Sequence, residues 1–202
     1  MTEVAPVEGI AMTKSTINIR AEKASDVVAR EALLDVAYGP GRHIKSSARL
    51  RLDRLPAAGL AFVATERGRV VGTVRLWHVA AGRGRPALLL GPLAVHPDFR
   101  SRGIGAALTQ HAVAEAQRLG HATVLLVGDA PYYGRFGFSA DKTGALRMPG
   151  PYERHRLLAS ELSPGALDGA HGIIHATGVK VPKPEPALPA VAEARGRTPR
   201  AA

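Results

Sequence analysis

Apolar residues along this chain recur alternately at the spacing of strands and at the spacing of helices. Isoleucines at every second position over residues 16–20 predict a short strand with one apolar face. Apolar residues recur every three to four positions over residues 24–37, which predicts a helix with Ser25 or Asp26 as its N-cap. The Gly-Pro-Gly sequence at 39–41 ends that helix.

The rest of the chain continues the alternation. We predict a helix at 46–55, strands at 60–66, 70–79 and 87–95, a helix at 104–119, a strand at 123–127, a short helix at 131–136 and a strand from Phe138. Strands interleaved with helices predict an α/β (α+β) fold with a mixed sheet. We expect one domain at 15–180, a flexible lead at 1–14, and a disordered tail at 181–202, where alternating prolines disfavour regular structure.

Gly91 and Pro92 interrupt the most apolar of these strands, at residues 87–95. The nearly continuous apolar run predicts a strand buried on both faces. Proline cannot donate to a sheet ladder, so it marks a bulge or a break. A break here would leave the neighbouring strand unpaired and open a cleft lined by free backbone groups. The alternative is an edge strand, against which the two apolar faces argue.

A glycine-rich turn joins this strand to the next helix, with the sequence Arg100-Ser101-Arg102-Gly103-Ile104-Gly105-Ala106. The first turn of a helix has unpaired N–H groups, glycines allow close approach, and arginines add positive charge. The turn therefore predicts a phosphate site, although its glycines could also serve only a tight turn. The Rossmann dinucleotide-binding fingerprint does not fit, because it needs glycine at position 108, which is leucine here. The phosphate-binding loop of nucleoside triphosphatases does not fit either, because no lysine follows these glycines.

The pattern Arg100-x-x-Gly103-x-Gly105, opening a helix after a broken strand, resembles the central cofactor motif of the GNAT superfamily of N-acetyltransferases. A second motif follows in the expected order, with a strand at 124–127 leading to Tyr133-x-x-x-Gly137-Phe138. The paired tyrosines and the segment 154–167 resemble the YhbS-like branch. The resemblance covers residues 16–180 and implies a GNAT-type acyltransferase fold with a splayed central sheet.

The resemblance also implies a reaction, the direct transfer of an acetyl group from acetyl-CoA to a primary amine. The pantetheine arm would lie along Leu93, Ala94 and Val95, and the pyrophosphate on the N–H groups of residues 102–106. The Val95 N–H would stabilise the oxyanion, and Tyr133 would donate a proton to the departing thiolate. The alternative is a packing role for Tyr133, with Tyr132 or a water as the donor.

The general base and the acceptor stay open. Better-known members often carry a glutamate on the interrupted strand, whereas residues 87–95 contain no carboxylate. The candidates for the base are Glu66, His78, Asp129 and a water chain, with His96 a weaker one. The segments 39–55 and 142–152 would wall the acceptor pocket and are basic, which favours an anionic or neutral small-molecule or peptide amine over a polyamine.

Composition limits the other classes of function. The chain has no cysteine, which excludes disulfides and thiolate catalysis, and its histidines show no metal-ligand spacing, so no metal is expected. The net charge of +10 lies mainly between residues 15 and 180, scattered and without interleaved aromatics, which argues against nucleic-acid binding. No apolar run could span a membrane and no signal peptide precedes the fold, so we expect a cytoplasmic protein.

Two alternative functions remain at this stage. The missing carboxylate on the interrupted strand is compatible with a non-catalytic acyl-CoA-binding regulatory module, and the positive charge with an RNA- or ribosome-associated protein. The sequence leaves the oligomeric state open, a homodimer included.

Overall fold

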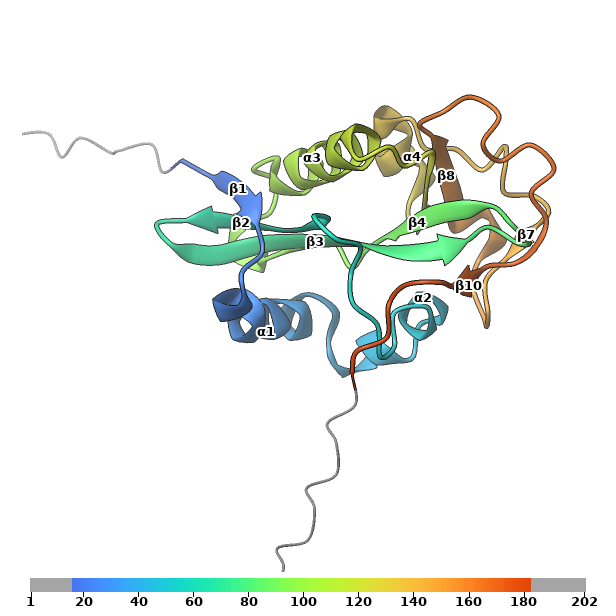
Figure 1. Ribbon diagram of the computed structural model, residues 1–202. Helices are drawn as coiled ribbons and strands as arrows, with labels where there is room; N and C mark the ends of the chain where they lie inside the picture. The colour runs from blue at the N-terminus through green and yellow to red at the C-terminus, as the bar shows by residue number, and fades with distance from the viewer. Residues whose placement is uncertain (1–15, 183–202) are drawn as a thin grey trace, which may run out of the picture.

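The computed structural model describes residues 16–182, so the expected lead and all but two residues of the expected tail lie outside it. Its largest element is an eight-stranded mixed sheet in the order β1-β2-β3-β4-β6-β8, with β5 and β10 also paired to β3 (Figure 1). These strands are β1 (Asn18–Ala21), β2 (Ala61–Glu66), β3 (Arg69–Ala80), β4 (Pro86–Leu90), β5 (Ala94–Val95), β6 (Thr123–Val127), β8 (Leu157–Glu161) and β10 (His175–Ala176). Two short strands, β7 (Leu146–Arg147) and β9 (Gly172–Ile173), form a separate parallel pair.

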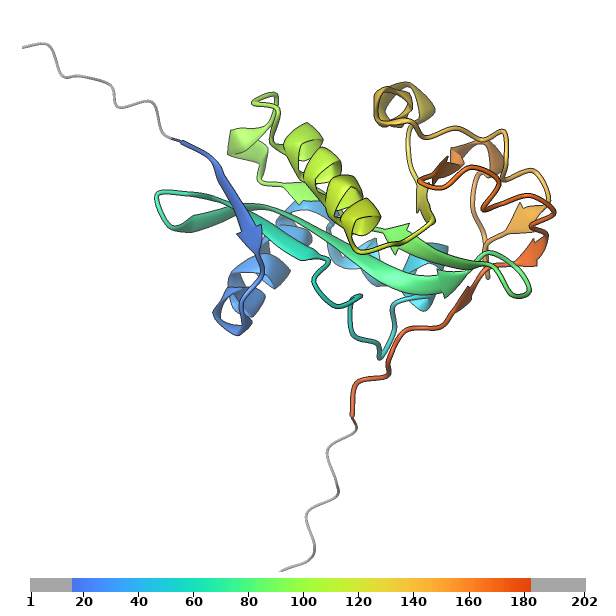
Figure 2. The ribbon, with the colours of Figure 1, turned by 45° about the horizontal axis from the view of Figure 1, so that its top comes forward.

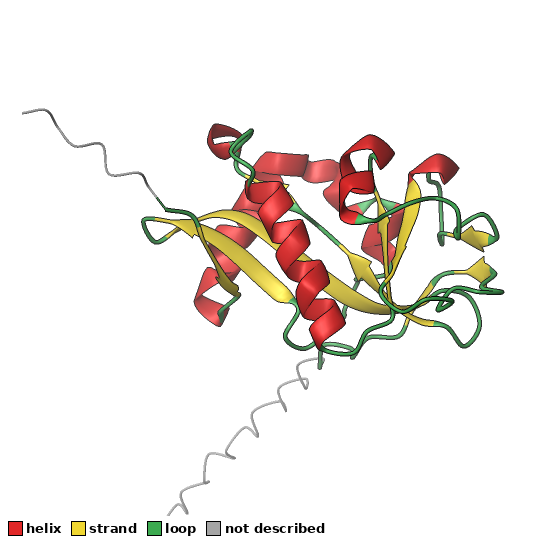
Figure 3. Cartoon of the chain, turned by 90° about the horizontal axis from the view of Figure 1, so that it is seen from above, coloured by secondary structure: helices red, strands yellow, loops and turns green. Residues whose placement is uncertain are grey.

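Helices cover both faces of the large sheet. The longest, α3 (Ile104–Arg118), lies on one face, while α1 (Val27–Tyr38) and α2 (Ser46–Arg49) lie on the other (Figures 1 and 2). Ile104, Leu108, Ala112 and Ala116 recur every four residues, which places them on one side of α3 against the sheet. Viewed from above, α3 runs obliquely across the strands (Figure 3). The short helix α4 (Ala130–Tyr133) follows β6 and continues as the 3₁₀ turn Gly134–Phe136.

Two of the predicted elements are wrong. The helix expected at 46–55 ends after one turn at Arg49, because Asp53 adopts a left-handed φ of 53° and Leu55 donates its N–H to the Val179 carbonyl. The strand expected from Phe138 is reduced to an isolated bridge between Ser139 and Ala159. In its place β8, which the sequence analysis missed, pairs antiparallel with the whole of β6.

The predicted break in the apolar strand is confirmed, and it splits the sheet. β4 lies between β3 and β6, pairing parallel with β6 through Leu88 and Leu89, so it is not an edge strand. Leu88 and Leu89 pack into the cores on opposite faces of the sheet, as expected for a strand buried on both faces. After the cis peptide between Gly91 and Pro92 the chain resumes as β5, which pairs with β3 alone. β5 and β6 therefore diverge beyond the break.

No helix within residues 16–182 combines the length and the apolar character that a membrane crossing needs.

Candidate active site

A cavity of about 390 Å³ opens at the N-terminus of α3, and we call it the loop cavity. It brings together most of the residues predicted to hold a phosphate. Its wall is formed by Val95, Phe99, Arg100, Ser101, Gly103, Ile104, Gly105, Ala106, Tyr132 and Arg135. The contiguous motif and the end of β5 therefore share one concave surface.

The backbone of the glycine turn presents unpaired donors to this cavity. Gly103 is the N-cap of α3 with a left-handed φ of 76°, which glycine adopts without strain. The first bond within the helix runs from the Ala107 N–H to the Gly103 carbonyl at 2.9 Å. The N–H groups of Ile104, Gly105 and Ala106 consequently have no partner within the helix, and these residues line the cavity. Unpaired donors at the positive end of a helix dipole favour an anion.

The charged side chains around the loop cavity differ from the prediction. Arg102 is not part of the cavity wall, because its guanidinium pairs with Glu66 and lies 5.2 Å from the Phe99 ring centre. Arg100 does line the cavity, and so does Arg135, which the sequence analysis missed. The Arg135 guanidinium carbon lies 4.2 Å from the centre of the Tyr132 ring. The spacing of three residues between these two was the available signal, since it places both on one side of a helical turn.

The strand β5 directs alternate backbone groups toward the gap between β5 and β6. The His96 N–H donates to the Val71 carbonyl at 2.9 Å, and Ala94 lies opposite Thr73. Because successive residues of a strand point their backbone groups to opposite sides, the N–H of Val95 points away from β3. The Ala94 side chain instead packs in the core against α1. The Leu93 carbonyl accepts a hydrogen bond from the Tyr38 hydroxyl.

A second cavity, also of about 390 Å³, lies beside the strand break, and we call it the chamber. Tyr133 lines the chamber, whereas its neighbour Tyr132 lines the loop cavity. The chamber wall consists of residues from α1, the segment 42–53, β3, the break, the end of β6 and α4: Glu31, Leu34, Tyr38, Arg42, His43, Lys45, Ser47, Ala48, Arg49, Arg51, Leu52, Asp53, Arg75, Trp77, Leu90, Gly91, Pro92, Leu93, Leu126, Val127 and Tyr133. The two tyrosines thus serve different parts of the site.

Packing fixes the ring of Tyr133 and keeps its hydroxyl protonated. The ring makes edge contacts with Phe136 and Phe138, at centre-to-centre distances of 6.4 and 5.9 Å. A Cβ atom at Gly128 would lie 2.3 Å from the Tyr133 ring, so only glycine allows this close approach. Burial, reinforced by Tyr38 and Tyr132, raises the pKa of Tyr133 above its ordinary value. At neutral pH this side chain is therefore a hydrogen-bond and proton donor.

None of the predicted candidates for the general base lines the chamber. Glu66 is paired with Arg102, His78 packs near the His121 ring, and Asp129 is exposed at the start of α4. His96 lies within 3.0 Å of an Arg69 guanidinium nitrogen. Within residues 16–182, no group of three or more histidine or acidic side chains is placed to hold a metal ion.

The two carboxylates that do line the chamber are Glu31 and Asp53. Burial acts to raise the pKa of Glu31, but hydrogen bonds from Arg30 and Arg42 outweigh it, so the net pKa is lowered. Asp53 is exposed. Glu31 is therefore a weak base, and a water chain stays the open alternative for deprotonating the amine.

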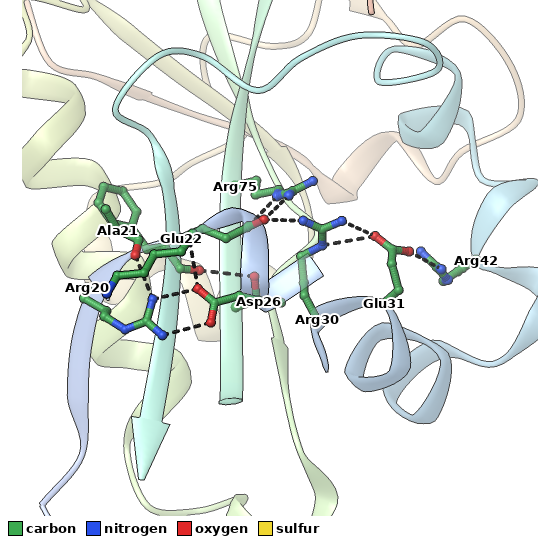
Figure 4. A network of polar contacts seen from close by, with 11 residues as sticks. Arg20, Ala21, Glu22, Asp26, Arg30, Glu31, Arg42 and Arg75 are labelled. Atoms are coloured by element: carbon green, nitrogen blue, oxygen red, sulfur yellow. Dashed lines mark hydrogen bonds and ion pairs between the residues drawn. The ribbon is translucent and has the colours of Figure 1, made fainter. Parts of the chain in front are cut away.

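Glu31, Arg42 and Arg75 of the chamber wall belong to a network of ion pairs, which is drawn in Figure 4. Glu22 accepts from both Arg30 and Arg75, and Arg30 also donates to Glu31. Arg42 completes the network by pairing with Glu31 and with Asp35. The network joins α1 to β3 and to the segment after α1, and its three arginines are balanced by three carboxylates.

Comparison with known proteins identifies the family. Residues 57–140 match the acetyltransferase (GNAT) domain. The uncharacterised N-acetyltransferase YhbS of Escherichia coli K12 is 30% identical over 158 residues, which cover 77% of this chain and 93% of YhbS. The uncharacterised N-acetyltransferase YjhQ of the same strain is 31% identical over 127 residues, 59% of this chain and 69% of YjhQ. The chain therefore belongs to the GNAT acetyltransferase family, as the two motifs predict.

Solved structures agree with this assignment. The crystal structure of E. coli YhbS in complex with CoA superimposes with a TM-score of 0.69 at 27% identity, covering 87% of this chain and 94% of that chain. A GNAT family acetyltransferase from Brucella melitensis in complex with acetyl-CoA gives a TM-score of 0.53 at 26% identity, covering 76% of this chain and 99% of that chain. The predicted GNAT-type fold and its YhbS-like character are confirmed.

Proposed function

We propose that this chain transfers the acetyl group of acetyl-CoA to a primary amine by direct attack on the thioester. The observation that carries the proposal is the joint placement of unpaired helix N–H groups in the loop cavity and a half-buried tyrosine on the wall of the chamber, next to the break in a splayed sheet. The two relatives crystallised with CoA and acetyl-CoA support the choice of cofactor.

The loop cavity fits the pyrophosphate of the cofactor. Its donors would be the N–H groups of Ile104, Gly105 and Ala106, and its cations Arg100 and Arg135. The space is narrow, because a Cβ atom at Gly105 would lie 3.0 Å from the Tyr132 hydroxyl and 3.6 Å from a Val95 methyl group. A cradle that a single Cβ would fill favours an occupant that packs directly on the backbone.

Residues at and near the strand break would carry out the acetyl transfer. The pantetheine arm would lie along Leu93 and the two residues of β5, Ala94 and Val95, as an added strand does. The Val95 N–H would stabilise the negative charge that develops on the thioester oxygen as the amine attacks. Tyr133 would then donate its proton to the departing sulfur, a role for which its raised pKa suits it, since a phenol that stays neutral can still donate.

Thiol release from acetyl-CoA, measured against panels of amines, amino acids, peptides and antibiotics, tests the proposal. We expect CoA to appear in proportion to an acetylated amine identified by mass spectrometry. CoA binding without thiol release for any amine would contradict enzymatic transfer and favour the non-catalytic binding module. Retention on DNA that is independent of CoA and weakens with salt would favour the nucleic-acid alternative. The cytoplasmic location and the homodimer stay predictions.

A further inference from the structure

The chamber wall carries more positive than negative charge once its ion pairs are counted. Arg42 and Arg75 belong to the balanced network of Figure 4. The remaining cations on the wall are Lys45, Arg49 and Arg51. The acid on the wall outside the network is Asp53, which is exposed to solvent. The net field in the chamber is therefore positive.

Arg51 differs from the other two cations in its surroundings. Lys45 and Arg49 are exposed, the first over the Tyr38 ring at 4.8 Å and the second donating to the Pro149 carbonyl at 3.3 Å. Arg51 is half-buried, and burial together with the nearby charge of Arg42 lowers its pKa to about 10. Within residues 16–182 its guanidinium has neither an ion pair nor a hydrogen bond.

The position of Arg51 places this cation beside the proposed transfer site. One of its terminal nitrogens lies 3.8 Å from the point where a Cβ atom of Gly91 would stand, next to the strand break. Leu93 and Tyr133 line the same chamber. A cation partly withdrawn from water without a counter-charge loses part of its hydration free energy, and a ligand that supplies the charge compensates for that loss. A guanidinium also presents paired donors that match the two oxygens of a carboxylate or phosphate.

We propose that Arg51 binds an anionic group, a carboxylate or a phosphate, on the amine acceptor and so selects amines that carry such a group. The inference rests on the proposed acetyltransferase function. Because Arg51, Leu93 and Tyr133 line the same chamber, an acceptor held by its anionic group at Arg51 could reach the transfer site with its amine. Polyamines and other purely cationic acceptors are disfavoured by the same field.

Matched acceptors and matched variants test this selection. The acceptors are β-alanine against β-alaninamide, and phosphoethanolamine against ethanolamine, so that each pair differs in its anionic group. The enzymes are the wild type, Arg51→Gln, and Arg49→Gln as the exposed control on the same wall. We expect the wild type to prefer the anionic member by roughly ten- to hundredfold in kcat/KM, the range of a charge-assisted hydrogen bond. Arg51→Gln should lose that preference and Arg49→Gln should keep it.

Stability and cofactor binding separate the outcomes. Arg51→Gln should unfold in urea at the same or a higher midpoint, because it removes a half-buried charge that has no ion pair among the described residues. Which pair shows the larger preference decides between carboxylate and phosphate. The role of Arg51 is overturned if the wild type uses the neutral and anionic acceptors of a pair equally, or if the preference survives Arg51→Gln. It is also overturned if an enzyme that acetyl-CoA stabilises uses neither anionic acceptor. If acetyl-CoA stabilises none of the three proteins, the proposed function itself fails.

Discussion

Tyr133→Phe removes one hydroxyl from the proposed transfer site and leaves its packing intact. The contacts of the ring with Phe136 and Phe138, and its close approach to Gly128, involve ring atoms that phenylalanine retains. The variant should therefore bind acetyl-CoA with little change in affinity. Its effect should fall on the transition state, where the departing sulfur needs a proton.

The size of the expected loss follows from the role of a general acid. Losing one typically lowers turnover by ~10²–10⁴-fold, which corresponds to about 3–5 kcal/mol of barrier height. The raised pKa of Tyr133 adds a second expectation. Its proton should be retained through pH 9, so wild-type turnover should not decline between pH 7 and 9 through loss of this donor.

The assay is thiol release at saturating acetyl-CoA, with calorimetry for cofactor affinity. Tyr132→Phe is the matched control, since Tyr132 lines the loop cavity beside Arg135. We expect this control to weaken cofactor binding more than it lowers turnover. Equal turnover of the wild type and Tyr133→Phe would refute the general-acid role. A large loss of turnover in Tyr132→Phe alone would assign the donor to Tyr132.

Three further changes test other parts of the account. Gly105→Val should abolish CoA binding in calorimetry while the urea midpoint changes little, because the new side chain fills the space beside Tyr132; normal affinity would show that the loop is only structural. Gly128→Ala should displace the Tyr133 ring, lowering turnover and costing about 1–3 kcal/mol of stability in urea unfolding; wild-type turnover would contradict the positioning argument. Hydrogen bonding from Arg20 lowers the pKa of Asp26 from 3.8 to about 2, so this carboxylate stabilises the fold above pH 4 and loses that contribution as pH falls through 2. The stability difference between the wild type and Asp26→Asn should therefore be constant from pH 7 to 5 and shrink below pH 4 in urea titrations, and a difference that grows toward acid would contradict the sign.

Local sequence patterns were sufficient to predict those helices and strands that are determined by their own residues. The helix predicted at 104–119 is observed as Ile104–Arg118, because its signals are local: the apolar spacing lies inside the segment and Gly103 and Gly120 flank it directly. The helix predicted at 46–55 failed because backbone groups near Leu55 pair with Val179, which is distant in sequence. The strand β8 exists through its pairing with β6, which no local pattern specifies.

The residues of the candidate site also divide into those that local sequence predicts and those that tertiary packing brings together. The glycine turn was predictable because its donors are contiguous and begin a helix. The side chains that complete the site come from separate segments, as Arg51 and Tyr38 do, and their proximity depends on tertiary packing. The pairing of Arg102, in the turn before α3, with Glu66 at the end of β2 could not be foreseen from spacing. The acetyltransferase family was thus readable from two short motifs. Of the two segments expected to wall the acceptor pocket, 39–55 lines the chamber through residues 42–53, whereas no residue of 142–152 does.

Thermal unfolding with and without acetyl-CoA tests the central claim most directly. A ligand that binds only the folded state at 100 times its Kd adds about 2.7 kcal/mol, which for a domain of this size raises Tm by roughly 5–11 °C. We predict such a rise with acetyl-CoA and with CoA, and none with NADH or ATP at the same concentration. No rise with CoA, or a larger rise with NADH, would contradict the assignment of the loop cavity to the cofactor of an acetyltransferase.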